Sequence, residues 1–169
     1  MADGGIADDP AAYPMDASEE DRSVVAELLG REPQGRFEVA LRDDDGVPRV
    51  LRNAPVLDDG TPMPTLYWLV SAHDRLVVSR LESTQAISRV QQEIDMDLIA
   101  AAHDRYRAER EALIPEDHTG PRPSAGVGGT RRGVKCLHAH YAYHLAGGDD
   151  PVGAWVAEQL AIEEADDDE

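Results

Sequence analysis

The segment RFEVALRDDDGVPRVLRNA, residues 36–54, decides the fold class. Phe37, Val39 and Leu41 alternate with charged residues, which predicts a strand with one apolar face. The run DDDG at 43–46 favours a turn, and VPRVLRNA can return beside the first strand. The segment therefore predicts an antiparallel β-hairpin.

A third strand and several helices surround this hairpin in the sequence. TLYWLV, residues 65–70, is mostly apolar and follows a loop rich in Asp, Gly and Pro, so we expect a buried strand there. Apolar residues at helical spacing predict helices over residues 17–30, 73–83, 84–106, 134–146 and 151–160. The expected fold class is α+β, with a small antiparallel sheet of about three strands packed by four or five helices.

The length and composition favour one domain with loose ends. A chain of 169 residues with 41% hydrophobic content can bury one core. We expect a disordered leader at 1–17, a single α+β domain at 18–162 and an acidic disordered tail at 163–169. The apolar runs are too short to cross a bilayer, and the first residues lack a signal-peptide pattern, so a cytoplasmic location is expected.

The charge balance limits the classes of partner. Against 34 acidic residues the chain has 16 basic ones, a formal net charge of -18. Such a surface repels nucleic acid and anionic membrane, so neither is expected as a partner. One segment reverses the trend, because residues 122–135 contain basic side chains and no acid. These basic residues are Arg122, Arg131, Arg132 and Lys135.

The basic segment contains a Gly-rich loop, SAGVGGTRRGVK, residues 124–135. Its glycines can point successive backbone N–H groups into one concavity, and a helix is expected to begin next to it, so the loop predicts an anion site. The residues expected to hold a phosphorylated or otherwise anionic small molecule are Gly128, Gly129, Thr130, Arg131, Arg132 and Lys135. The alternative is a flexible connector whose arginines pair with surface carboxylates.

The helix that follows carries a cysteine and three histidines. At about 100° per residue, Cys136, His140 and His144 share one side of the helix, whereas His138 falls with the large aliphatic residues and is expected in the core. Cys136 and His140 at i and i+4 make a weak zinc pattern, and His144 lies too far from Cys136 to join them. CxxC and HExxH motifs are absent, and the alternative is that these residues are structural.

Two further charged segments have a structural explanation. Residues 103–110 mix Asp and Glu with Arg at helical spacing, which is typical of a solvated, salt-bridged face. Arg80 and Glu82 are interpreted in the same way. The functional alternative is that one arginine of residues 103–110 joins the basic loop in holding an anion.

Four motifs in order resemble the bacterial family called domain of unknown function 501. They are PTLYWL at 64–69, RLES at 80–83, DRYRAER at 104–110 and GVKCLHAHYAYHLAGGDDPVG at 133–153. The resemblance spans about residues 21–160 and implies no established activity. It implies a small cytoplasmic bacterial protein whose gene commonly lies near those for a septum-formation initiator protein, enolase and an exopolyphosphatase-type phosphatase. It also implies a shared site around Lys135, Cys136 and His138.

Three hypotheses for the function follow from these observations. The first is a module that binds an anionic small molecule at residues 126–138. The second is an enzyme or metal site that uses Cys136 as nucleophile or ligand and a histidine, with His138 as the candidate, as base or second ligand. The third is a non-catalytic protein partner linked to cell division. The sequence identifies no cofactor and leaves the three hypotheses open.

Overall fold

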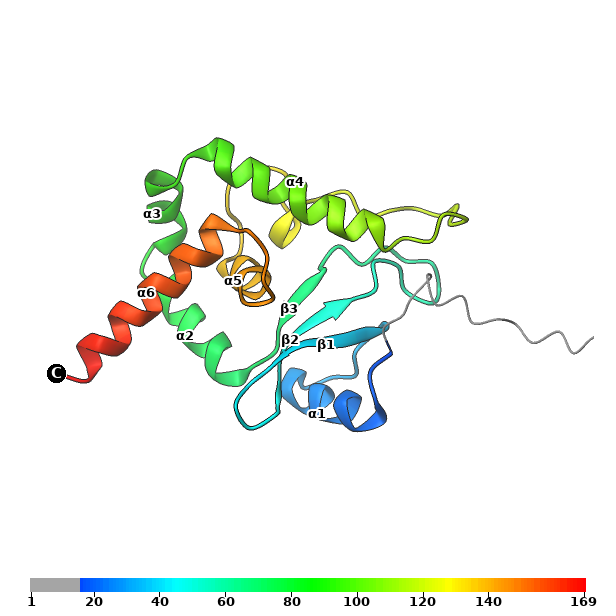
Figure 1. The fold of residues 1–169 in the computed structure, drawn as a ribbon, viewed down its shortest axis with the longest axis horizontal. Helices are drawn as coiled ribbons and strands as arrows, with labels where there is room; N and C mark the ends of the chain where they lie inside the picture. Colours follow the sequence, from blue (N-terminus) through cyan, green and yellow to red (C-terminus); the bar gives the residue numbers. More distant parts are fainter. Residues whose placement is uncertain (1–15) are drawn as a thin grey trace, which may run out of the picture.

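In the computed structural model, which describes residues 16–169, a three-stranded antiparallel sheet separates one small helix from a larger helical layer (Figure 1). The strands are β1 (Phe37–Arg42), β2 (Pro48–Asn53) and β3 (Tyr67–Leu69), arranged in the order β1-β2-β3. The central strand β2 pairs with both neighbours. The expected hairpin and third strand are confirmed. The expected leader at 1–17 lies almost wholly outside the described residues.

Six α-helices complete the fold, so the α+β class is confirmed. They are α1 (Glu19–Leu29), α2 (Ala72–Glu82), α3 (Ala86–Glu93), α4 (Met96–Ala112), α5 (Leu137–Leu145) and α6 (Pro151–Asp167), with a short 3-10 helix η1 (Val127–Gly129) before α5. The sequence predicts four or five helices because it treats residues 84–106 as one. The chain breaks at Ile94, which is extended, and Asp95 then caps α4 by accepting from the Asp97 N–H at 2.8 Å.

The two faces of the sheet pack into two separate cores. On one face α1 contributes Val25, which packs with Phe37, Leu51 and Val70. On the other face Val50 and residues of β3 pack against the helical layer. Because side chains alternate along a strand, the apolar residues of β2 supply both cores.

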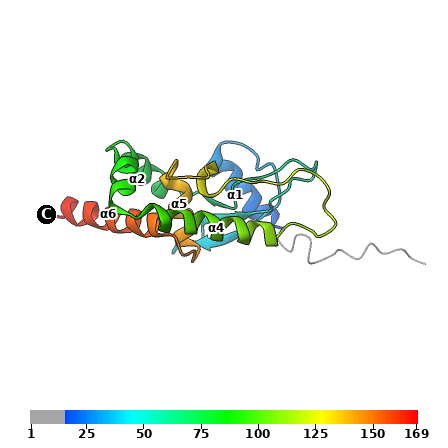
Figure 2. The ribbon, with the colours of Figure 1, turned by 90° about the horizontal axis from the view of Figure 1, so that it is seen from above.

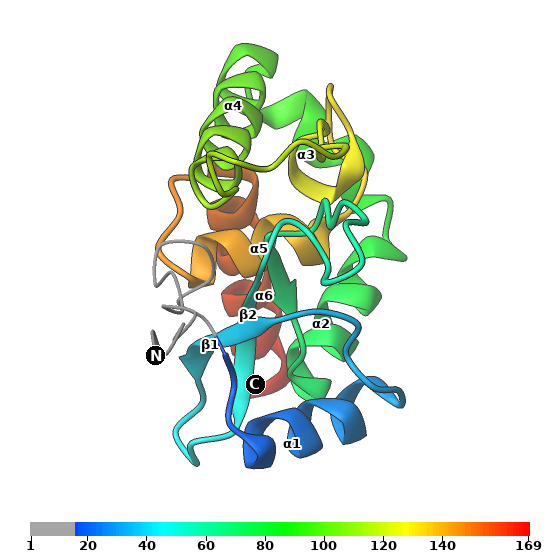
Figure 3. The same cartoon turned by 90° about the vertical axis from the view of Figure 1, so that its right-hand side faces the viewer.

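Helix α5 lies at the centre of the helical layer. Figure 3 shows it between the sheet and α4, and it also contacts α2, α6 and η1. Figure 2 shows α4 and α6 on the same side of the molecule. Most of the circumference of α5 is therefore covered, and its residues are positioned by several elements at once.

The C-terminal segment departs from the expected disorder. Helix α6 continues to Asp167, so residues 163–167 are helical, although their side chains are exposed. None of the helices in residues 16–169 is long and apolar enough to cross a membrane.

Candidate functional site

The start of α5 sets the geometry of the candidate site. Cys136 is the N-cap residue, with an extended backbone at φ -142°, and the helix begins only at Leu137. The predicted helix began at residue 134. Cys136 therefore does not follow the helical spacing that grouped it with His140, and that grouping is wrong.

A carboxylate from α2 accepts a backbone hydrogen bond from the first turn of α5. Oε1 of Glu82, the last residue of α2, accepts a hydrogen bond from the backbone N–H of Leu137 at 2.8 Å. A carboxylate is favourable at this position because the helix dipole is positive at its N-terminus. An anionic ligand at this N–H group would have to displace the chain's own carboxylate.

Three potential metal ligands converge beside this helix start. Oε1 of Glu82 lies 3.2 Å from Nδ1 of His138, and Sγ of Cys136 lies 3.9 Å from the same nitrogen. One donor atom from each residue lies within 4.8 Å of the other two, and all three residues are half-buried. Among residues 16–169 this is the group of Cys, His and acidic side chains with the spacing of a metal site.

The other ring nitrogen of His138 fixes the orientation of the imidazole. Nε2 lies 3.2 Å from the carbonyl oxygen of Arg75 and 3.0 Å from Oγ of Ser79. A carbonyl oxygen only accepts, so Nε2 carries a proton and donates it. A hydrogen bond with Cys136 and the negative charge of Glu82 raise the pKa of His138, although burial opposes them.

His140, expected on the same side of the helix as Cys136, is fully buried. Its Nδ1 donates to Oδ2 of Asp150 at 2.6 Å, and Asp150 also caps α6 by accepting from the Val152 N–H at 2.9 Å. His138, expected in the core, is 25% exposed. The contrast between a core side with His138 and an opposite side with His140 fails, because a helix that is covered on several sides has no single core face.

Several backbone N–H groups of the Gly-rich loop already have hydrogen-bond partners within the chain. The Val127 N–H donates to Nδ1 of His103 at 2.9 Å, and the Gly126 and Gly129 N–H groups bond to carbonyls of the same loop. Gly128, with φ +71°, packs against Cys136, since a Cβ on Gly128 would lie 3.3 Å from the Cβ of Cys136. The loop therefore packs against Cys136, and the N–H groups of Gly126, Val127 and Gly129 are not available to an anion.

The basic residues of the loop stand apart from the chain's carboxylates. Arg131 donates to Oγ of Ser124 at 3.0 Å. No carboxylate in the described part of the chain lies within ion-pair distance of Arg131, Arg132 or Lys135, whereas seven arginines elsewhere form such pairs. The structure therefore gives no support to the alternative that these arginines pair with surface carboxylates.

A comparison with known protein families matches a part of the chain that includes the three potential metal ligands. Residues 39–158 match the family described as "Protein of unknown function (DUF501)". The chain belongs to this family. The match includes Glu82, Cys136 and His138 of the DUF501 chain. No curated protein and no solved structure gives a significant match.

Sequence reasoning missed Glu82 in the DUF501 chain. The motif RLES contains Glu82, but the mixed charges of this segment predict a solvated face. The residue lies 55 positions before Leu137, and only the packing of α2 against α5 brings the two together. Spacing along the chain gives no signal for such a contact. The one signal in the sequence is that RLES is among the motifs that carry the resemblance to the family.

Proposed function

We propose that the protein binds a divalent transition metal, zinc by its donor set, through Glu82, Cys136 and His138. The observation that carries the proposal is the convergence of sulfur, nitrogen and oxygen donors on one point. Tetrahedral zinc with usual bond lengths would place sulfur and nitrogen about 3.6 Å apart, and nitrogen and oxygen about 3.4 Å apart. The corresponding two distances in the structure, 3.9 Å and 3.2 Å, differ from these values by a few tenths of an ångström, and the sulfur and a Glu82 oxygen lie within 4.8 Å of each other.

The arrangement fits a metal better than a thiol nucleophile with a histidine and acid relay. In such a relay the histidine uses one ring nitrogen for the nucleophile and the other for the acid. Here Cys136 and Glu82 both face Nδ1 of His138. A shared nitrogen is what convergence on one ion requires.

The surroundings of the ligands support the same conclusion. A metal-binding histidine commonly donates its second N–H to a carbonyl or carboxylate, which holds the ring and leaves the other nitrogen for the ion. The Arg75 carbonyl takes this role for His138, and the Leu137 N–H holds Glu82. Two of the three ligands are thus oriented by a second layer of hydrogen bonds.

Three protein ligands leave one position of a tetrahedral ion free. Catalytic zinc sites have this pattern, and structural zinc sites usually have four protein ligands. The free position would take water or a substrate oxygen, whose charge the ion would polarise. The half-buried ligands allow access from solvent.

The test is equilibrium binding of zinc to the reduced protein, measured by competition with a chromophoric chelator. We expect one zinc per chain, and we expect Cys136→Ser and His138→Gln each to weaken binding by more than about tenfold. His144→Gln is the matched control, because it changes a histidine of α5 outside the cluster. Absence of zinc binding in the wild type, or equal weakening in the control, would contradict the proposal.

A second candidate function is binding of a phosphorylated or other anionic small molecule at residues 126–138. The observation in its favour is that Arg132 and Lys135 are exposed and form no ion pair with a described carboxylate, in a chain of net charge -18. It predicts phosphate binding that is lost when both residues are changed to alanine. No described contact bears on the protein-partner hypothesis, which stays a prediction.

A further inference from the structure

The C-terminal half of α6 extends away from the rest of the protein. Figure 1 shows its red end running past α2, clear of the sheet and of α4. Leu160 is the last buried residue of the helix, and every residue of 161–167 is exposed. This part of α6 is therefore accessible to another molecule.

A hollow with apolar residues on both walls lies between α2 and this part of α6. It has a volume of about 350 Å³, and Val77 of α2 and Leu160 of α6 line it. Two large apolar side chains flank the hollow, Leu76 at 50% exposure and Ile162 at 55%. Each lies one helical turn before a charged residue that lines the hollow. Exposed apolar side chains that gather around a hollow are typical of an interaction site.

The rim of this hollow is acidic. Glu163, Glu164, Asp166 and Asp167 line it, with Arg80 as the basic residue among the lining side chains. None of the four carboxylates forms an ion pair with a basic side chain of residues 16–169. Four carboxylates against one arginine leave a negative excess at the hollow.

The same carboxylates destabilise the helix that carries them. Glu163 and Glu164 lie four and three residues before Asp167, and like charges at these spacings repel on a helix surface. The last turn of α6 also contains no basic residue, although the C-terminal end of a helix favours cations. A cationic partner bound along this segment would reduce both repulsions, so the surface is complementary to positive charge.

We propose that the hollow between α2 and α6 binds a basic amphipathic helix of another protein. The apolar face of that helix would contact Val77, Leu160 and Leu76, and its Lys and Arg side chains would pair with the carboxylates of α6. A helix fits because two helices already form the walls, and a third can pack against both. A second copy of the chain does not fit, because it would bring a further net charge of -18 to an acidic surface. The proposal does not depend on the proposed metal site.

The experiment measures binding of a fluorescent peptide to the full chain by anisotropy, at about 0.15 M ionic strength. The peptide contains only Leu and Lys, spans about four helical turns, and has its leucines on one face, at i, i+3, i+4 and i+7. A second peptide has the same composition, with the leucines distributed around the helix. We expect the amphipathic peptide to bind at least about tenfold more tightly than the second one. It should also slow amide hydrogen exchange in residues 161–167.

Two variants locate the binding surface. Glu163→Gln/Glu164→Gln and Leu76→Ser should each weaken binding of the amphipathic peptide by at least about tenfold. The matched control is Glu116→Gln/Asp117→Asn, which removes the same charge from exposed positions in the loop after α4. Figure 1 shows this loop at the opposite end of the molecule from the end of α6. The control should keep the wild-type affinity.

Three results would overturn the proposal. The first is equal binding of the two peptides, which would reduce the interaction to charge attraction alone. The second is an equal loss of affinity in Glu163→Gln/Glu164→Gln and in the control. The third is self-association of the wild type in sedimentation that Glu163→Gln/Glu164→Gln abolishes, which would make a second copy the occupant.

Discussion

Oε1 of Glu82 lies 2.8 Å from the backbone nitrogen of Leu137 and 3.2 Å from Nδ1 of His138, so one carboxylate both caps the start of α5 and belongs to the proposed metal-binding cluster. Substitutions of Glu82 can distinguish its capping role from its proposed role as a metal ligand. Glu82→Gln keeps an acceptor for the Leu137 N–H but removes the charge that a metal needs. Glu82→Ala removes both.

We therefore expect the two Glu82 variants to differ in stability and agree in metal affinity. Glu82→Ala should lose about 1 kcal/mol of unfolding free energy, the usual worth of a helix cap, and Glu82→Gln much less. Both should bind zinc more weakly than the wild type. Urea unfolding in the presence of chelator measures the first quantity, and chelator competition the second. Equal stability losses would contradict the capping role.

Gly128 should be sensitive to substitution because of its contact with Cys136. Gly128→Ala strains a backbone at φ +71° and places a methyl group 3.3 Å from the Cβ of Cys136. Gly46→Ala is the matched control, since its φ is +81° and a Cβ there meets nothing within 4 Å. Each should lose about 1 kcal/mol from strain.

Only the Gly128 variant should also lose zinc affinity, because it displaces the thiol. Chemical denaturation and zinc competition on both variants check this. Unchanged zinc affinity in Gly128→Ala would show that the loop does not position Cys136.

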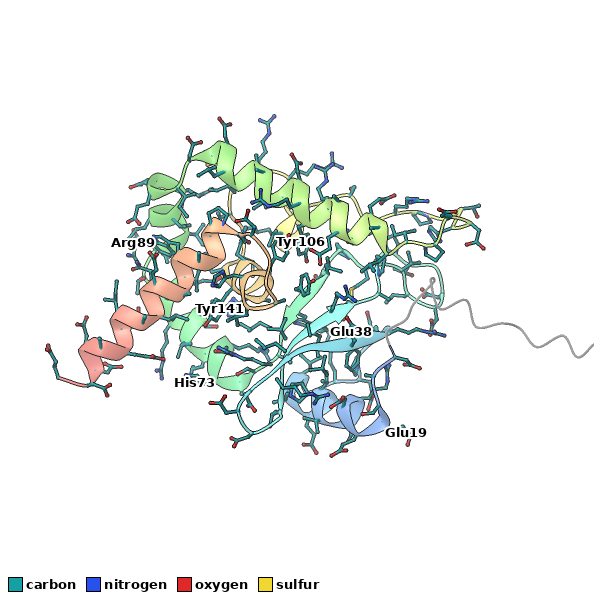
Figure 4. All side chains as sticks on the ribbon, viewed as in Figure 1. Glu19, Glu38, His73, Arg89, Tyr106 and Tyr141 are labelled. Atoms are coloured by element: carbon teal, nitrogen blue, oxygen red, sulfur yellow. The ribbon has the colours of Figure 1, made fainter. Side chains whose placement is uncertain are left out.

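Tyr106 should contribute to stability through its hydroxyl group. The oxygen accepts from the Leu66 N–H at 2.6 Å and the Tyr67 N–H at 3.3 Å, and the side chain is buried between α4 and the start of β3 (Figure 4). Burial raises the pKa of Tyr106 to about 12. Tyr106→Phe leaves two buried N–H groups without this acceptor and should cost about 1–3 kcal/mol.

The control for Tyr106 is Tyr141→Phe. The Tyr141 hydroxyl has one long contact, 3.4 Å from Arg49, so its loss should cost less. Thermal unfolding of the two variants compares them. A Tyr141 variant as unstable as the Tyr106 variant would contradict the importance of the buried N–H groups.

Two histidines should give opposite pH dependences of stability in metal-free buffer. Burial lowers the pKa of His103, whose Nδ1 accepts from Val127 and whose Nε2 donates to the Gly133 carbonyl at 2.8 Å. Its stabilising contribution is present above the unfolded pKa, about 6.5, and is lost as the pH falls below it. His138 has a raised pKa, so its contribution is present below about 6.5 and is lost as the pH rises through the folded value.

The difference can be measured by urea unfolding between about pH 5 and pH 8 with chelator present. His103→Gln should reduce the loss of stability on the acid side of that range. His138→Gln should reduce the loss on the alkaline side. The same change of slope in both variants would contradict the opposite signs.

The sequence predicts the hairpin well because the alternation of Phe37, Val39 and Leu41 reflects a half-buried strand. It does not predict the break between α3 and α4, since Ile94 continues the apolar spacing and only the capping Asp95 marks the boundary. For the site, the KCLH motif identifies Cys136 and His138. Glu82 joins the site only through its contact with Leu137, 55 positions later, which residue spacing does not encode.

The most direct test of the central proposal is a titration of the reduced apoprotein with Co²⁺, followed by absorption spectroscopy. Cobalt takes the place of zinc in such sites, and a bound thiolate gives a sulfur-to-cobalt charge-transfer band. We predict that the band appears at one Co²⁺ per chain, disappears in Cys136→Ser and weakens in His138→Gln and Glu82→Gln. Cobalt binding without this band, or the same spectrum in Cys136→Ser, would contradict a metal site at Glu82, Cys136 and His138.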